Sequence, residues 1–242
     1  MRLDKFVSHS CRLTRKEAQK KIKLGLVSVD GKIVTQIAYQ IEADDDIKVE
    51  NQDATLVRHG YWMLNKPAGF ICANSDPHHR TVFDLFDKNI KDKYQKKTLQ
   101  IAGRLDIDTT GLVLITSDGQ WNHYITSPNN RCPKSYRVEI EKPLNSQDKN
   151  VLESGIQLAG EKKITQPAEL ENLHNNIWNL TIYEGKFHQV KRMFAAVNNR
   201  VLNLHRFKIG EVTLDSELEP GTYRSLMEAE INSFNFRGQP NG

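Results

Sequence analysis

The chain has 242 residues, of which 38% are hydrophobic and 26% charged, and its net charge is +4. This length suits one large domain or two smaller ones, and the sequence contains no apolar run long enough for a membrane span. Because its start lacks the apolar segment of a secretory signal and its three cysteines are far apart, we expect a cytoplasmic protein with reduced thiols.

Positive charge is concentrated at the N-terminus. Residues 1–28 contain eight lysines and arginines and only two acids. Their local net charge is +6, so the remaining chain carries −2. Such a basic stretch binds RNA phosphates or forms the solvated face of a helix pair, and composition alone leaves both readings open.

Short elements are expected in this basic head. We predict a helix over residues 3–10. A second helix begins at Thr14, which forms a capping box with Glu17, and ends near Gly25. The apolar residues on either side of Asp30-Gly31 predict a hairpin.

The same stretch carries a recognisable pattern: Arg2-Leu3-Asp4-Lys5, then Thr-Arg-x-x-Ala-x-x-x-Ile, then Val-x-Val-Asp-Gly-Lys-x-Val. Together these resemble the S4 RNA-binding domain. The resemblance implies a small S4-like α/β RNA-binding domain over residues 1–58, with a linker at about residues 51–59. It also implies phosphate contacts from basic side chains, namely Arg2, Lys5, Arg12, Arg15, Lys16 and Lys20.

Strands and helices are irregularly interleaved in residues 59–234. Alternation over residues 134–140 predicts a strand with Tyr136 on its apolar face, and apolar spacing over residues 188–198 predicts an amphipathic helix. Other strands are expected at residues 61–64, 112–116, 177–182 and 202–209, other helices at 82–86, 120–126 and 146–154, and a tight turn at Asp118-Gly119. This order favours an α+β fold on a mixed, largely antiparallel sheet. We expect residues 235–242 to be a disordered tail.

One loop combines the residue types that chemistry requires. Residues 103–112 hold Arg104, Asp106 and Asp108 between two glycines and lead into an apolar strand. From the residues alone, Asp106 is either a catalytic carboxylate or the ion-pair partner of Arg104, and Asp108 fits a turn whose side chain binds its own backbone. The chain has no Gly-x-Gly-x-x-Gly, complete Walker, Gly-x-Ser-x-Gly or His-Glu-x-x-His pattern. We therefore expect no metal and no organic cofactor.

The loop also matches a family motif. Gly-Arg-Leu-Asp-x-x-Thr-x-Gly-Leu resembles the central motif of pseudouridine synthases. Three other stretches resemble further motifs of that family in the right order: Lys66-Pro67-Ala68-Gly69, Lys134-x-Tyr136 and Glu184-Gly185-Lys186-Phe187-His188-Gln189-Val190-Lys191-Arg192-Met193. At the variable positions the chain is most similar to the branch that acts on small-subunit (16S) ribosomal RNA.

This resemblance implies a reaction and a role for each motif residue. Asp106 attacks either C1′ of the sugar or C6 of the base, Lys191 or alternatively Arg192 is its cationic partner, and Tyr136 stacks on the uracil. Arg104 braces the space that the flipped nucleotide leaves. Further substrate contacts are expected from Lys66, His78, His79, Arg80, Arg192 and Arg206.

The implied partner is 16S ribosomal RNA or an assembling small subunit, modified by a monomer without a cofactor. One alternative is a synthase that acts on large-subunit (23S) ribosomal RNA. Another is a non-catalytic S4-type assembly factor, although that reading predicts a damaged set of motif residues. An S4-headed methyltransferase requires a glycine-rich donor loop, which the chain lacks.

Removal of residues 1–58 is expected to weaken RNA binding and flatten its salt dependence, because each lost phosphate contact removes roughly 0.7–0.9 from the slope of log K against log salt. Filter binding to ribosomal RNA over a salt series measures this slope. An unchanged slope after truncation would contradict the assignment of the basic head as the RNA anchor.

Overall fold

The structure is a computed structural model that describes residues 1–11, 13–42, 45–54, 59–93 and 99–234. The chain divides into two compact units, Met1–Arg58 and His59–Gly242. Within the described residues, no helix is both long enough and apolar enough to cross a membrane. Arg12, part of the expected linker and the expected disordered tail lie outside the described residues.

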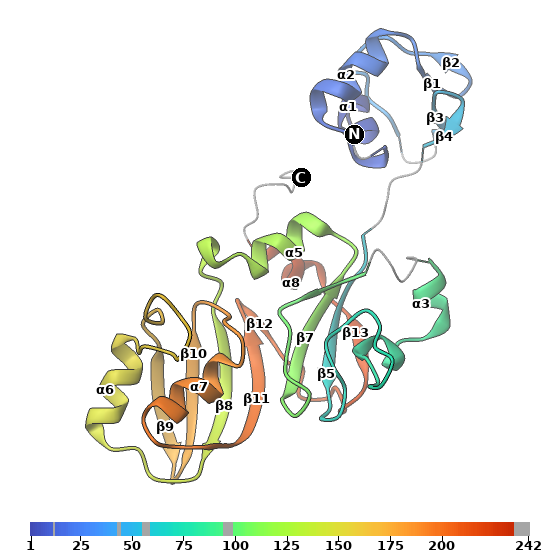
Figure 1. The fold of residues 1–242 in the computed structure, drawn as a ribbon. Helices are drawn as coiled ribbons and strands as arrows, with labels where there is room; N and C mark the ends of the chain where they lie inside the picture. The colour runs from blue at the N-terminus through green and yellow to red at the C-terminus, as the bar shows by residue number, and fades with distance from the viewer. Residues whose placement is uncertain (12, 43–44, 55–58, 94–98, 235–242) are drawn as a thin grey trace. The chain divides into compact units, whose positions relative to one another are not determined.

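The first unit consists of two helices and a small antiparallel sheet with the strand order β2-β1-β3-β4 (Figure 1). Thr14 and Glu17 form the expected capping box at the start of the second helix. The helices are α1 (Leu3–Ser10) and α2 (Arg15–Lys23), and the strands are β1 (Val27–Val29), β2 (Lys32–Ile33), β3 (Ile47–Val49) and β4 (Gln52–Asp53).

Strand β4 occupies residues that we expected to be linker, and the backbone explains why. Glu50 and Asn51 both adopt positive φ angles of 53° and 63°. Two consecutive residues of this kind form the two-residue hairpin turn whose twist matches that of the flanking strands. The chain therefore turns back and pairs β4 with β3 before it leaves the unit.

A buried carboxylate organises the basic surface of this unit. Asp4 is 1% exposed and accepts hydrogen bonds from Arg2, Arg15 and Gln19 at 3.1–3.3 Å. Burial alone would raise the pKa of Asp4, but these hydrogen bonds, led by that of Arg15, lower it to about 2. Asp4 thus fixes two of the predicted RNA contacts while both guanidinium groups stay accessible to solvent. Of the basic residues predicted to contact RNA, those that the structure describes are mostly exposed. Lys5 is half-buried, and the exposed ones are Arg2, Arg15, Lys16 and Lys20.

The second unit is built on one large sheet. Within the described residues, nine strands join it, and the main path runs β13-β5-β7-β11-β8-β10-β9, with β6 on β7 and β12 on β11. Strands β7 and β11 are parallel, and the other described pairs are antiparallel. This confirms the expected α+β class with a mixed, largely antiparallel sheet. The strands are β5 (Tyr61–Lys66), β6 (Gln100–Ala102), β7 (Thr110–Thr116), β8 (Lys134–Ile140), β9 (Glu169–His174), β10 (Ile177–Ile182), β11 (Val201–Ile209), β12 (Val212–Thr213) and β13 (Tyr223–Ser225).

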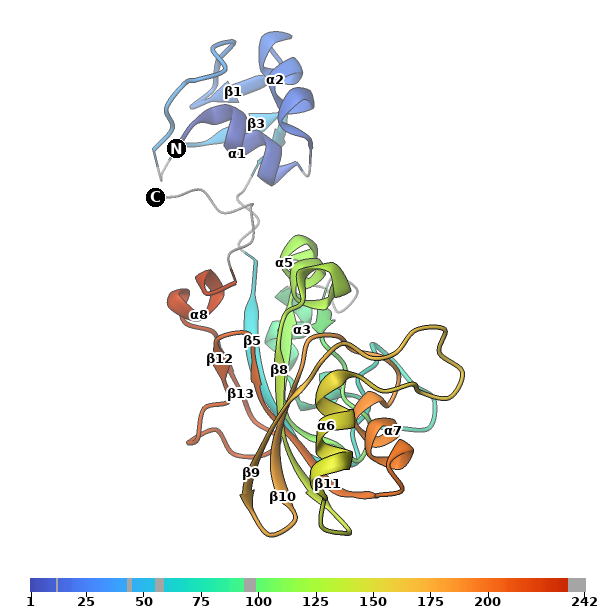
Figure 2. The same ribbon diagram turned by 90° about the vertical axis from the view of Figure 1, so that its left-hand side faces the viewer.

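Both faces of this sheet are covered (Figures 1 and 2). Because side chains alternate along a strand, Trp62 and Leu64 of β5 pack into one core and Met63 into the other. The first core is closed by η1 (Val82–Leu85), α3 (Lys88–Lys93), α6 (Ser146–Ser154) and α7 (Gln189–Ala196), and the second by α5 (Gly119–Thr126) and α8 (Glu228–Asn232). The 3-10 turn η2 (Pro128–Asn130) follows α5.

Asp118 corrects one local expectation. We predicted a tight turn at Asp118-Gly119, but Asp118 is the N-cap of α5, and its carboxylate accepts from the amides of Gln120 and Trp121. Aspartate is one of the preferred N-cap residues, since its carboxylate satisfies amides that the first helical turn leaves without partners. The chain therefore passes from β7 directly into α5, which confirms the helix expected at residues 120–126.

Gly111 allows the two parallel strands to meet. It has a φ of +100°, and a Cβ atom at this position would lie 2.2 Å from the carbonyl oxygen of Arg206. Gly111 and Arg206 are directly opposite each other in the register of β7 and β11. A side chain here would therefore strain the backbone and push the two strands apart.

The substitution Gly111→Ala is expected to destabilise the second unit by about 3 kcal/mol or more, because backbone strain and overlap with Arg206 act together. Gly185→Ala is the matched control. The space around Gly185 is open within 4 Å, so this change should stay within about 0.5 kcal/mol. Urea unfolding followed by tryptophan fluorescence measures both, since all three tryptophans belong to this unit. Equal midpoints for the two variants would refute the packing argument.

Candidate active site

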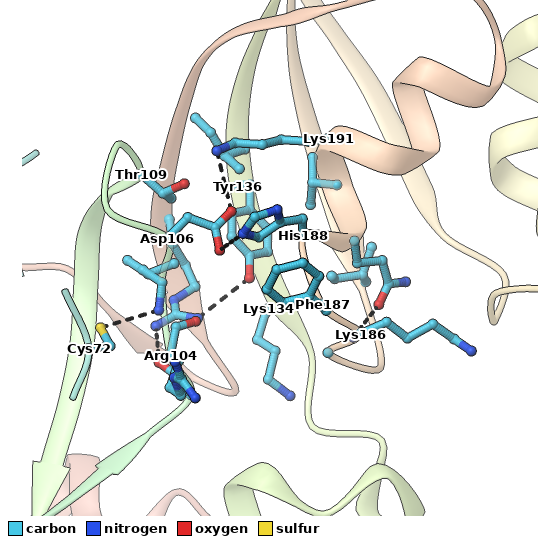
Figure 3. Close-up of a pocket in the computed structure, with 18 of the residues that line it drawn as sticks. Cys72, Arg104, Asp106, Thr109, Lys134, Tyr136, Lys186, Phe187, His188 and Lys191 are labelled. Atoms are coloured by element: carbon cyan, nitrogen blue, oxygen red, sulfur yellow. Dashed lines mark hydrogen bonds and ion pairs between the residues drawn. The ribbon is translucent and has the colours of Figure 1, made fainter. Parts of the chain in front are cut away.

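A cavity of about 800 Å³ opens on the second unit. Its walls come mainly from four parts of the chain: the 103–109 loop before β7, the start of β8, the middle of β11 and the segment that leads into α7. In Figure 3, the side chains of Asp106, His188 and Lys191 point toward one another, and Tyr136 lies beside them.

Two cationic or protonatable groups contact the Asp106 carboxylate. The Nζ of Lys191 lies 3.3 Å from Oδ2, and the Nε2 of His188 lies 3.4 Å from Oδ1. His188 is the N-cap of α7, and Lys191 follows three residues later on the same face. Asp106 therefore lies against the first turn of a helix, where the helix dipole also favours negative charge.

Lys191 also binds Asp108, with 2.5 Å between Nζ and Oδ1. We expected the Asp108 side chain to bind its own backbone, and its own amide does donate to it. The ion pair with Lys191 was not expected, and it forms because the loop directs both carboxylates to one ammonium group. The hydrogen bond from Lys191 lowers the pKa of Asp108. Burial alone would lower the pKa of Lys191, but the two carboxylates outweigh it and raise that pKa. Lys191 is therefore a firmly protonated partner of Asp106.

Arg192, the alternative partner in the sequence, faces elsewhere. Its guanidinium group donates to the carbonyl oxygens of Phe187 and Ala159 and pairs with Glu161 at 3.3 Å. The structure thus brings Lys191, and not Arg192, to Asp106. Arg192 instead fixes the segment before α7.

Tyr136 lies in the cavity wall on β8 and is 7% exposed. Its hydroxyl oxygen is 3.5 Å from Nη1 of Arg206, and the guanidinium carbon of Arg206 is 5.9 Å from the centre of the tyrosine ring. Arg206 faces Tyr136 and Gly111 in the registers of β8 and β7. The three residues therefore form one row across three neighbouring strands.

Arg206 is buried, which corrects its expected role as a phosphate contact. It is 1% exposed and donates to the carbonyl oxygens of Leu112, Gly103 and Arg104 at 2.8, 2.6 and 3.4 Å. Gly103 and Arg104 belong to the loop and Leu112 to β7, and a buried carbonyl without a donor costs about 1–3 kcal/mol. Arg206 therefore stabilises the loop from beneath and does not reach RNA in this conformation.

Lys66 requires the same correction. It is fully buried at the end of β5, and its Nζ donates to the carbonyl oxygens of Thr109, Pro67 and Ile107 at 2.7, 3.0 and 3.3 Å. Burial lowers the pKa of Lys66, while the nearby acidic groups Cys72, Asp108 and Asp106 oppose that shift. Lys66 thus holds the second half of the loop that carries Asp106.

The remaining predicted contacts are exposed. Arg104 lines the cavity, and its carbonyl, not its guanidinium group, is held by Arg206. His78 and His79 lie in a loop fastened to Asp76, and Arg80 stacks over the Phe70 ring at 4.5 Å. All four residues are exposed to solvent.

The structure adds three residues to which the sequence alone led us to assign no role. His188 contacts Asp106, Phe187 lines the cavity beside it, and Lys134 enters the cavity wall while donating to the carbonyl oxygen of Cys132 at 2.8 Å. Burial lowers the pKa of Lys134. The three-residue spacing of His188 and Lys191 was the available signal, because it places both side chains on one helical face.

Comparisons with known proteins identify relatives of both units. The profile of the RNA pseudouridylate synthase family matches residues 60–196, and that of the S4 domain matches residues 1–47. The ribosomal small subunit pseudouridine synthase A of Haemophilus influenzae is 48% identical over 232 residues, which cover 96% of this chain and 98% of the relative. The protein of the same name from Escherichia coli K12 is 46% identical over 235 residues, covering 96% and 99%. A crystal structure of a pseudouridylate synthase matches with a TM-score of 0.69 and 46% identity, covering 97% of this chain and 99% of that one.

The conservative change Arg206→Lys is expected to destabilise the second unit by about 2–4 kcal/mol, because lysine cannot replace a fork that reaches several carbonyl oxygens. The same change at the exposed Arg137 of β8 should cost less than about 0.5 kcal/mol. Urea unfolding with tryptophan fluorescence compares the two. If Arg206→Lys were as mild as Arg137→Lys, Arg206 would be a replaceable surface cation and not the support of the loop.

Proposed function

The chain belongs to the RNA pseudouridine synthase family, and on this premise we propose that it converts a uridine of small-subunit (16S) ribosomal RNA to pseudouridine with Asp106 as nucleophile. The observation that carries the proposal is the Asp106 carboxylate, held between Lys191 and His188 at the wall of a cavity that also contains Tyr136. The choice of RNA is supported by the names of relatives that match nearly the whole chain.

The reaction rearranges bonds without a net change of oxidation state. The bond between N1 of uracil and C1′ of the ribose breaks, the base rotates, and C5 joins C1′. C5 then loses its proton, and N1 gains one. Attack of Asp106 at C1′ and attack at C6 both require an ionised carboxylate and a base that is free to rotate.

The surroundings of Asp106 suit a nucleophile. Desolvation by a bound nucleotide opposes ionisation of a carboxylate, whereas a neighbouring cation favours it. Lys191 provides this charge, and its second bond to Asp108 fixes its direction. His188 contacts the other carboxylate oxygen and limits the rotation of Asp106.

Tyr136 is the proposed stacking partner of the uracil and the relay for the C5 proton. A phenol accepts and donates at the same oxygen. Arg206 donates to the hydroxyl oxygen of Tyr136. The phenolic proton is therefore free to exchange with a group in the cavity. Tyr136 thus faces the uracil while its hydroxyl is held from behind.

The exposed basic side chains suit the handling of RNA. A stacked uridine must be flipped out of the RNA at a cost of a few kcal/mol, and Arg104 at the cavity is the candidate to brace the space it leaves. His78, His79 and Arg80 are candidates for phosphate contacts. Residues 1–58 anchor the RNA through their basic side chains, and the enzyme acts as a cytoplasmic monomer on free RNA or on an assembling small subunit.

The substitution Asp106→Asn is expected to lower the rate by a factor on the order of 10³ or more, because it removes the nucleophile. Asp108→Asn is the matched control two residues away. It breaks an ion pair with a largely exposed aspartate, worth at most about 1 kcal/mol, and should cost roughly fivefold or less. Release of tritium from ribosomal RNA labelled at C5 of uridine measures both, with unfolding curves as a check on stability.

Two outcomes would contradict the proposal. Retained tritium release by Asp106→Asn would exclude this nucleophile. Mapping of pseudouridines in both ribosomal RNAs, from cells with and without the protein, tests the substrate. Loss of a pseudouridine from 23S instead of 16S ribosomal RNA would move the activity to the large subunit.

A further inference from the structure

Phe187 is a large aromatic side chain that the fold leaves in solvent. It is 75% exposed, although it lines the cavity beside the proposed nucleophile. Its ring stacks on that of His188 with 3.7 Å between centroids and 21° between planes (Figure 3). One face of the Phe187 ring is therefore covered by an aromatic neighbour, while most of the side chain remains accessible.

The backbone beneath this ring pair is held firmly. Arg192 donates to the carbonyl oxygen of Phe187 at 2.9 Å. The buried Gln189 accepts from the amide of Lys186 and donates to Glu184, both at 2.9 Å. His188 itself adopts a left-handed conformation with φ of 48°. An exposed ring on such a support keeps its orientation and loses little freedom when a ligand covers it.

The ring pair has a defined position relative to the reaction. His188 contacts Asp106 at 3.4 Å, and Phe187 stacks on His188. A flat group that covers Phe187 is thus separated from the nucleophile by the aromatic pair, whereas the uracil that reacts must reach Asp106 itself. The Phe187 surface is suited to a neighbour of the reacting base.

The surrounding charge indicates what this neighbour is. Arg104, which is exposed, lines the same cavity. Lys186 and Lys191 line it too, but Lys186 pairs with Glu161 at 3.0 Å and Lys191 with the carboxylates of the site. An exposed guanidinium group beside an exposed aromatic ring matches the two halves of a nucleotide, since the phosphate binds to the guanidinium group and the base stacks on the ring. An apolar protein partner would contact the ring but would gain nothing from Arg104.

We propose that Phe187, supported by His188, is a stacking site for the base of a nucleotide that flanks the target uridine. This inference rests on the proposed function and adds a second base-binding position to the site. Stacking is tolerant of base identity. The position therefore adds affinity for an unpaired flanking nucleotide but discriminates little between the four bases.

Tritium release under single-turnover conditions, with 16S ribosomal RNA labelled at C5 of uridine, separates binding from chemistry. Phe187→Ala is expected to raise the half-saturating enzyme concentration roughly 5- to 100-fold and to leave the rate at saturation within about twofold. Phe187→Trp should restore binding. The control is Leu173→Ala, which removes a partly exposed apolar side chain of β9 outside the cavity wall.

A second measurement reports stacking without activity. Phe187→Trp places an indole at the site, and its fluorescence should be quenched by a short oligouridylate but not by an abasic ribose-phosphate oligomer of the same length and charge. Equal quenching by both oligomers, or an unchanged half-saturating concentration in Phe187→Ala, would overturn the inference. A loss confined to the saturating rate would assign Phe187 to the target base. Absence of tritium release by the unaltered chain would instead contradict the proposed function.

Discussion

The site depends on two buried cations that bind main-chain oxygens. Arg206 donates to the carbonyl oxygens of Gly103, Arg104 and Leu112, and Lys66 donates to those of Pro67, Ile107 and Thr109. Burial of a charge is costly unless it is fully hydrogen-bonded. The buried carbonyl oxygens of the loop in turn require hydrogen-bond donors, so the cations and the loop stabilise each other. Asp106 takes its position from this mutual arrangement.

The row Gly111–Arg206–Tyr136 connects that loop to the rest of the cavity. It crosses β7, β11 and β8 at the parallel pair of the sheet, so one side chain contacts the loop and the tyrosine together. The helix α7 completes the site, because the segment between β10 and β11 presents His188 and Lys191 to Asp106. Rigid strands therefore support one half of the site and a helix N-terminus supports the other.

Local patterns predicted local structure well. The capping box of Thr14, the alternation around Tyr136 and the apolar spacing of α7 depend on neighbours within one element, so the sequence displays them directly. The α+β class followed from the order of these elements. Motif resemblance pointed to Asp106 and Lys191, which the structure brings together.

Features that depend on distant partners could not be predicted in the same way. Lys66 and Arg206 read as surface cations, because their carbonyl partners are identified only once the loop is folded over them. Asp108 shares Lys191 for a similar reason, since the sharing requires contact between residues 83 positions apart. The strands β6, β9, β12 and β13 were missed because their pairing partners determine them more than their own side chains do.

Hydrogen bonding to main-chain oxygens has a consequence for which residues the loop can contain. Every residue has a carbonyl oxygen, whatever its side chain. Lys66 and Arg206 therefore stabilise the shape of the loop independently of its side chains. Ile107, for example, is held through its carbonyl oxygen while its side chain is 40% exposed. The shape of the loop that carries Asp106 thus depends on main-chain atoms and not on the identity of its exposed side chains.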